Sequence, residues 1–94
     1  MRLWSYIIKM YYNNIPKLDI HGYDSKSAIA LVDSFVISNY EAGYNEICVI
    51  HGIGKNVLKE ELYKYLQLKK DIVNCYKLNI NNIGETVIYL NEIN

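Results

Sequence analysis

The sequence predicts an α/β fold, specifically an α+β two-layer sandwich with the order β-α-β-α-β-β, a mixed sheet and both helices on one face. Two observations support this prediction. From Pro16 onward, strand-like apolar runs alternate with stretches whose apolar residues recur at helical spacing, and two β-rich runs joined by a turn close the chain. A length of 94 residues with 51% hydrophobic composition fits one small core. We therefore expect one domain over residues 16–94 and an N-terminal extension over residues 1–15.

The extension is apolar and short. Leu3, Ile7 and Tyr11 keep helical spacing, which predicts a short helix that lies on the core or on a protein partner. Arg2 and Lys9 interrupt the stretch, and no small-residue cleavage site follows it. This pattern argues against a signal peptide and against a membrane span.

The first strand and helix follow directly. Leu18–His21 has the composition of a strand, and Asp24 is suited to cap the N-terminus of the helix after it. Gly43 is suited to end that helix as its C′ residue. The predicted buried face of the helix consists of Ala28, Val32, Phe35 and Val36.

The second half of the chain repeats the alternation and then adds a hairpin. Ile47–Ile50 is a continuous β-rich run, typical of a strand buried on both faces. A second helix is predicted from apolar residues at the spacing of one face: Leu58, Leu62, Tyr65 and Leu66. Two more strands are expected, with a turn between them: Val73–Ile80, Asn81–Gly84 and Thr86–Leu90.

Composition narrows the function classes. Cys48 and Cys75 lie in predicted strands without metal-type spacing, so we expect buried reduced thiols and a cytoplasmic location. Ten basic residues balance ten acidic ones, so no large positive field indicates nucleic-acid binding. Any polyanion must then be bound locally.

Two His-Gly pairs, His21-Gly22 and His51-Gly52, each stand where a predicted strand gives way to a helix. Parallel strands bring both to one carboxyl edge, where open α/β sheets place ligands. A histidine there is often structural, but an imidazole also transfers protons near neutral pH. Asp19 precedes His21 by two residues, so both side chains point to the same side.

The stretch after the second His-Gly pair is suited to binding a phosphate group. Gly52 and Gly54 permit a sharp turn whose N–H groups point at an anion, and Lys55 and Lys59 stand beside the helix start. Glycines at such turns also serve steric needs alone.

Two further residues have both a structural and a functional interpretation. Asp19 orders its own turn, or it orients a histidine or holds a divalent metal such as Mg²⁺ or Mn²⁺. Tyr23, beside the first His-Gly pair, is the one tyrosine that we predict to stack on a base; the other tyrosines are expected to pack.

These residues also carry a family resemblance. Leu18–Gly22, followed by His51–Lys59, resembles the paired motifs of the small MutS-related (Smr) domain, and the resemblance extends over residues 18–90. It implies the same architecture, with nicking or cleavage of DNA or RNA and binding of branched or structured nucleic acids. Lys59 stands where the family has Arg, which keeps the charge but loses bidentate phosphate geometry. Asn56 replaces a glycine of the second motif, and Asn accepts left-handed conformations and can cap the helix.

The sequence as a whole is interpreted as a stand-alone Smr domain that binds structured DNA or RNA and hydrolyses a phosphodiester bond as a weak endonuclease. His51 is the leading acid/base, His21 its partner, and Asp19 the orienting group or metal ligand. The predicted nucleic-acid-binding residues are Gly52, Gly54, Lys55, Asn56, Lys59 and Tyr23. Two alternatives stay open: a non-catalytic module for branched DNA or ribosomal RNA, and a protein-interaction domain that uses the N-terminal segment.

Overall fold

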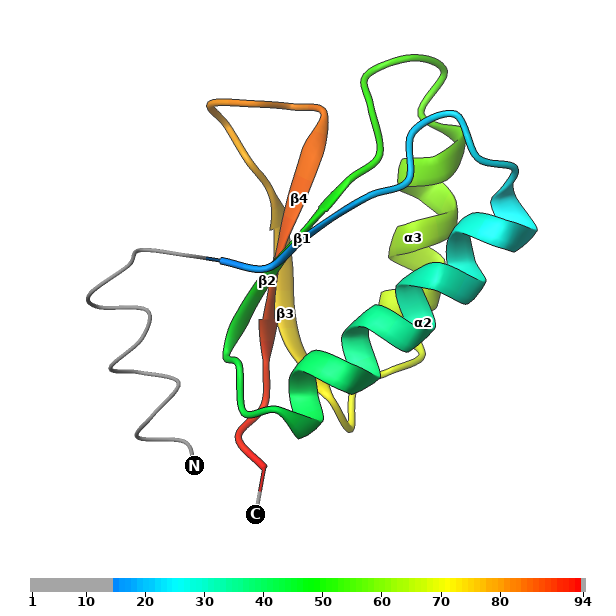
Figure 1. Cartoon of the computed structure of the whole chain (residues 1–94). Helices are drawn as coiled ribbons and strands as arrows, with labels where there is room; N and C mark the ends of the chain where they lie inside the picture. Colours follow the sequence, from blue (N-terminus) through cyan, green and yellow to red (C-terminus); the bar gives the residue numbers. More distant parts are fainter. Residues whose placement is uncertain (1–14, 94) are drawn as a thin grey trace.

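The computed structural model describes residues 15–93, so the helix expected in the N-terminal extension lies outside the described residues. Four strands and two helices follow the predicted order (Figure 1). Their bounds are β1 Lys17–Asp19, α2 Ser25–Glu41, β2 Glu46–Ile50, α3 Val57–Gln67, β3 Val73–Leu78 and β4 Glu85–Leu90.

The strands form one mixed sheet in the order β1-β2-β4-β3. β1 and β2 are parallel, and β4 runs antiparallel to both of its neighbours, β2 and β3. Helices α2 and α3 cover the same face of this sheet (Figure 1). The predicted two-layer α+β architecture is therefore confirmed.

Two strands are shorter than predicted. β1 ends at Asp19 rather than His21, because the Ile20 carbonyl accepts a hydrogen bond from the Tyr23 amide at 3.2 Å and starts a turn. β3 ends at Leu78, because the Asn79 amide donates to the Glu85 carbonyl and closes the hairpin loop.

Both predicted ends of α2 are confirmed. The side chain of Asp24 accepts a hydrogen bond from the Ser27 amide at 3.0 Å, which caps the helix and lowers the pKa of the Asp24 carboxyl. Gly43 follows the helix with φ +89°, a left-handed conformation that glycine adopts without a steric cost.

The hydrophobic core lies between the sheet and the two helices, as the apolar periodicity predicts. Its buried members are Ile20, Ala28, Val32, Val36, Ile47, Val49, Leu62, Leu66, Val73, Ile88 and Leu90. The helices are also tied by a polar contact, since the Tyr65 hydroxyl donates to Asp33 at 2.6 Å. Burial and this carboxylate raise the pKa of Tyr65. Within the described residues, no helix is long and apolar enough to span a membrane.

The two cysteines are both free, but only one is buried. Cys48 lies in the central strand β2, where burial raises the pKa of its thiol to about 11. Cys75 is exposed, which corrects the prediction of two buried thiols. The reason is its position in the edge strand β3: the next residue, Tyr76, packs against the core, so Cys75 points to the opposite face of the sheet.

Candidate functional site

Three loops meet at the end of the sheet where β1 and β2 finish: β1–α2, β2–α3 and β3–β4. The carbonyl of Gly84 accepts hydrogen bonds from the amides of His51 and Gly52, both at 2.9 Å. A Cβ atom placed on Gly52 would lie 3.3 Å from the Cβ of His21. The fold thus places the two His-Gly pairs side by side.

In the first pair, His21 and Asp19 form an exposed dyad. The Nδ1 atom of His21 lies 2.5 Å from Oδ1 of Asp19, and the His21 amide donates to the same oxygen at 3.1 Å. These hydrogen bonds lower the pKa of Asp19. Because an ionised carboxylate only accepts, Nδ1 carries the proton and Nε2 of the neutral ring keeps a free lone pair. Nε2 has no hydrogen-bond partner within residues 15–93, and the side chain is 67% exposed.

In the second pair, His51 is buried and both of its ring nitrogens are occupied. Nδ1 lies 2.9 Å from the Gly52 carbonyl, which only accepts, so Nδ1 donates. Nε2 of the neutral ring then accepts from the Thr86 hydroxyl at 2.9 Å. Thr86 Oγ1 in turn accepts from the Tyr63 hydroxyl, also at 2.9 Å. His51 is therefore held in one tautomer by a chain of hydrogen bonds.

The surroundings of His51 favour its neutral form. Burial lowers its pKa, and the nearby positive charge of Lys59 lowers it further; the Gly52 carbonyl and Glu85 act in the opposite direction. The sequence-based assignment of His51 as the leading acid/base stays a prediction. Its hydrogen bonds suit a residue that braces the loop, whereas the geometry of His21 suits proton transfer.

The loop from Gly52 to Asn56 leads into a helix start without a side-chain cap. Gly52 has φ +85°, and Asn56, the N-cap residue of α3, has φ +64° with no side-chain cap hydrogen bond in the described chain. The unpaired N–H groups of a first helical turn attract anions. Lys55 is exposed beside them, while Glu60 in the same turn offsets part of the positive charge.

A cleft of about 380 Å³ opens at this helix start. It is lined by Gly22, Tyr23, His51, Gly52, Gly54, Lys55, Asn56, Val57 and Leu58. Six of the predicted site residues are in this set. Lys59 is outside it although its charge reaches His51. His21 and Asp19 stand at its edge, since His21 adjoins the lining residue Gly52.

The sequence did not reveal the residues that fix His51 and its loop by hydrogen bonds. Thr86 and Tyr63 come from β4 and α3, and Gly84 comes from the hairpin loop. Thr86 is fully buried, a rare position for a hydroxyl, which signals a bound partner. The sequence alone offered one hint, a polar residue at the start of an otherwise apolar strand.

The donor set around Asp19 does not fit a resident divalent metal. Mg²⁺ prefers several oxygen ligands, and among residues 15–93 no group of three or more His, Cys, Asp or Glu side chains could hold an ion. One oxygen of Asp19 is already engaged by His21. The acid–base groups of the described residues are therefore considered without a metal held by the protein.

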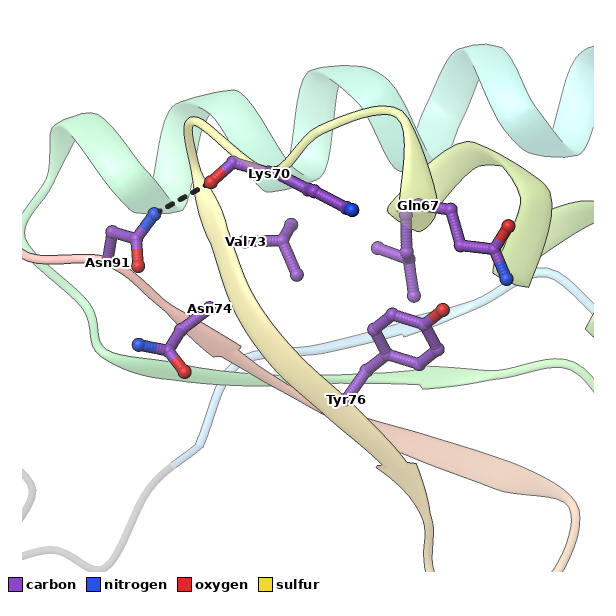
Figure 2. A pocket seen from close by; sticks show the side chains of 7 residues that line it. Gln67, Lys70, Val73, Asn74, Tyr76 and Asn91 are labelled. Carbon is purple, nitrogen blue, oxygen red and sulfur yellow. Dashed lines mark hydrogen bonds between the residues drawn. The ribbon is translucent and has the colours of Figure 1, made fainter.

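A second cavity, of about 270 Å³, lies near the C-terminal end of α3 and gathers none of the predicted site residues (Figure 2). Amide side chains and one lysine dominate its lining: Leu66, Gln67, Lys70, Val73, Asn74, Tyr76 and Asn91. Asn91 is already used there, because it donates to the Lys70 carbonyl at 3.1 Å (Figure 2). The loop end of the sheet remains the site that the sequence indicates.

Comparisons with known proteins agree with this fold and show the family. Residues 18–91 match the family model of the Smr domain. The crystal structure of the Smr domain of Thermus thermophilus MutS2 superposes with a TM-score of 0.78 at 21% identity, covering 82% of this chain and 99% of that one. YdaL, a stand-alone small MutS-related protein from Escherichia coli, gives a TM-score of 0.78 at 18% identity, covering 92% and 74% of the two chains.

Among curated relatives, the endonuclease MutS2 of Ligilactobacillus salivarius is 34% identical over 76 residues, or 79% of this chain and 10% of that protein. The endonuclease MutS2 of Clostridium acetobutylicum is 37% identical over 68 residues, or 72% of this chain and 8% of that protein. The chain thus spans about a tenth of the length of these relatives.

Proposed function

Because the chain belongs to the Smr domain family and is related to one domain of MutS2 endonucleases, we propose that it binds structured nucleic acid at the cleft and cleaves a phosphodiester bond there. The observation that carries this proposal is the Asp19–His21 dyad beside an uncapped helix start. Phosphodiester hydrolysis needs a proton acceptor next to a site for the phosphate, and this end of the sheet supplies both.

In the proposed mechanism, His21 acts as the general base. Its Nε2 atom takes a proton from the water that attacks phosphorus, while Asp19 holds the Nδ1 proton and stabilises the imidazolium that forms. The P–O bond to the leaving strand breaks as the new P–O bond forms, and the leaving oxygen takes a proton from solvent, to which this site is exposed. This division resembles the roles of histidine and carboxylate in hydrolases that use an acid–base pair.

The loop from Gly52 to Asn56 and the first turn of α3, here called the cradle, bind the phosphate and its developing negative charge. The backbone amides of the first turn of α3, which follow Asn56, have no intrahelical partner, and Lys55 and Lys59 add positive charge close by. Gly54 has no atom within 4 Å of the place where a Cβ would stand, so the backbone there is open to a ligand. His51 braces this loop through its bond to the Gly52 carbonyl.

A cleavage assay tests the proposal. The purified protein is incubated with matched branched DNA, linear DNA and structured RNA, with and without Mg²⁺ or Mn²⁺. We expect discrete products that disappear with His21→Ala and persist with Leu68→Ala, a change at a residue that is 83% exposed at the far end of α3. The comparison with and without metal decides whether a divalent ion is required.

Binding without cleavage would favour the alternative, a non-catalytic module for branched DNA or ribosomal RNA. The observation on its side is the uncapped start of α3, because free amides at a helix start can bind a phosphate without any catalytic group. In that case His21→Ala leaves affinity unchanged and no preparation yields products. A cytoplasmic location fits both versions, because the two thiols are free.

A further inference from the structure

The cleft has an apolar wall as well as a polar one. Tyr23, Val57 and Leu58 are the apolar side chains of its lining. Tyr23 is 51% exposed, Val57 is 53% exposed, and Ile53 between the two loop glycines is 61% exposed. Apolar side chains that stay exposed to water do not gain the favourable free energy of burial. A phosphate alone gains no binding free energy from contact with apolar side chains, so this lining favours a ligand that also has an apolar part.

The charge balance points the same way. The formal net charge of the chain is +0, and Glu60 in the first turn of α3 offsets part of the charge of Lys55 and Lys59. Proteins that bind duplexes through the backbone neutralise many phosphates at once. With Lys55 as the one lysine in its lining and Lys59 nearby, the cleft lacks that source of affinity. We therefore expect contacts to a base to supply the remaining binding free energy.

An unpaired nucleotide offers both chemistries in one ligand. Its phosphate is anionic, and the flat face of its base is open, whereas in a duplex the base faces are stacked on their neighbours. Stacking of a base on an aromatic ring contributes about 1–3 kcal/mol and tolerates any base. Tyr23 is the aromatic residue in the cleft lining.

From these observations we infer that the preferred ligand of the cleft is a DNA or RNA strand with an unpaired nucleotide, its phosphate at the start of α3 and its base against Tyr23. This inference rests on the proposed function, because it names the substrate class of the same cleft. The apolar side chains of Val57 and Leu58, in the same lining, are then available to contact the edge of the base.

Fluorescence anisotropy with labelled probes tests the inference. The probes share one sequence and are a single strand, a fully paired duplex and a duplex with one bulged nucleotide, each made as DNA and as RNA. We expect the single strand and the bulged duplex to bind at least about tenfold more tightly than the paired duplex. Tyr23→Ala removes about tenfold of that affinity and leaves the paired duplex unchanged.

Two control variants isolate the ring. Tyr23→Phe keeps the stacking surface and should bind like the original protein, while Leu68→Ala removes an exposed apolar side chain remote from the cleft. Since Tyr23 is exposed, circular dichroism should show an intact fold in both Tyr23 variants. Equal affinity for the paired duplex and the single strand overturns the inference but leaves the proposed function standing. Failure of the folded protein to bind any probe overturns both. If Tyr23→Ala binds the single strand as tightly as the original protein does, Tyr23 makes no stacking contact and the inference is overturned.

Discussion

The two strand-to-helix connections of this fold begin with the same dipeptide and do different things. After β1, His21 is exposed, its Nε2 is open, and the helix that follows is capped by Asp24. After β2, His51 is buried, its Nε2 is occupied by Thr86, and the helix that follows has no side-chain cap. Among residues 15–93, one connection thus leaves a ring nitrogen without a hydrogen-bond partner, and the other leaves a helix start without a side-chain cap.

The positions of the strands explain the difference. β1 is an edge strand, so only one neighbouring loop can cover the chain after it. β2 lies between β1 and β4, so the chain after it packs under α3 and against the hairpin carbonyl of Gly84. The same His-Gly dipeptide therefore has an exposed imidazole after the edge strand and a buried, hydrogen-bonded one after the central strand.

The largest expected effect comes from the open nitrogen. His21→Ala should lower the single-turnover cleavage rate about a hundredfold or more, as loss of a general base typically does, with little change in the melting temperature because the side chain is exposed. His51→Ala should instead lower the melting temperature, since it leaves the buried hydroxyl of Thr86 without this partner. A His21→Ala protein that cleaves at the full rate would reverse the assigned roles.

Gly54→Val tests the cradle in the second connection. Open space surrounds the Cβ position of Gly54, so valine should fit the fold while blocking the approach of an anion to the backbone. We expect binding of a single-stranded probe to weaken about tenfold with an unchanged melting temperature. The matched variant Gly52→Val should unfold more easily, because Gly52 has φ +85° and its new Cβ would press on His21. Undiminished affinity in folded Gly54→Val argues against the cradle.

Much of the fold was predictable because local signals agreed with the tertiary structure. Asp24 as a cap and Gly43 as a C′ residue mark the ends of α2, and both depend on short-range chemistry that the sequence states directly. The Asp19–His21 contact was likewise predictable, because residues two apart on a strand point to the same side.

The parts that the sequence did not predict depend on strand register and on position in the sheet. Thr86 meets His51, 35 residues before it in the sequence, because β4 lies beside β2 in the register that pairs Val49 with Thr86. The exposure of Cys75 follows from the place of β3 at the sheet edge, which the predicted order of elements left open. The different roles of the two histidines follow from the same long-range facts.

The pH dependence of stability sharpens the contrast between the histidines. The folded state lowers the pKa of His51 below the value of 6.5 for a free side chain, chiefly through burial. As pH falls below about 6.5, the unfolded chain takes up this proton before the folded one does, so the stability contributed by neutral His51 is complete above 6.5 and declines below it. Thermal melts between pH 7.5 and 5.5 should show a falling melting temperature that is less steep in His51→Gln. Parallel curves for the two proteins would contradict the burial argument.

The smallest expected effects concern the two helix starts. Asp24→Ala removes the side chain that accepts a hydrogen bond from the Ser27 amide, so the melting temperature should drop by a few degrees.

Asn56→Gly should leave the melting temperature unchanged or raise it slightly, because the Asn56 side chain makes no cap hydrogen bond in the described chain and glycine adopts its φ of +64° without strain. Thermal melts of both variants, with and without a single-stranded probe, complete the comparison. The probe should stabilise the Asn56→Gly protein as much as the original one, since an anion at the start of α3 binds backbone amides that glycine retains. A cost of Asn56→Gly equal to that of Asp24→Ala would mean that Asn56 caps α3 in solution, and the start of that helix would then not be open to a phosphate.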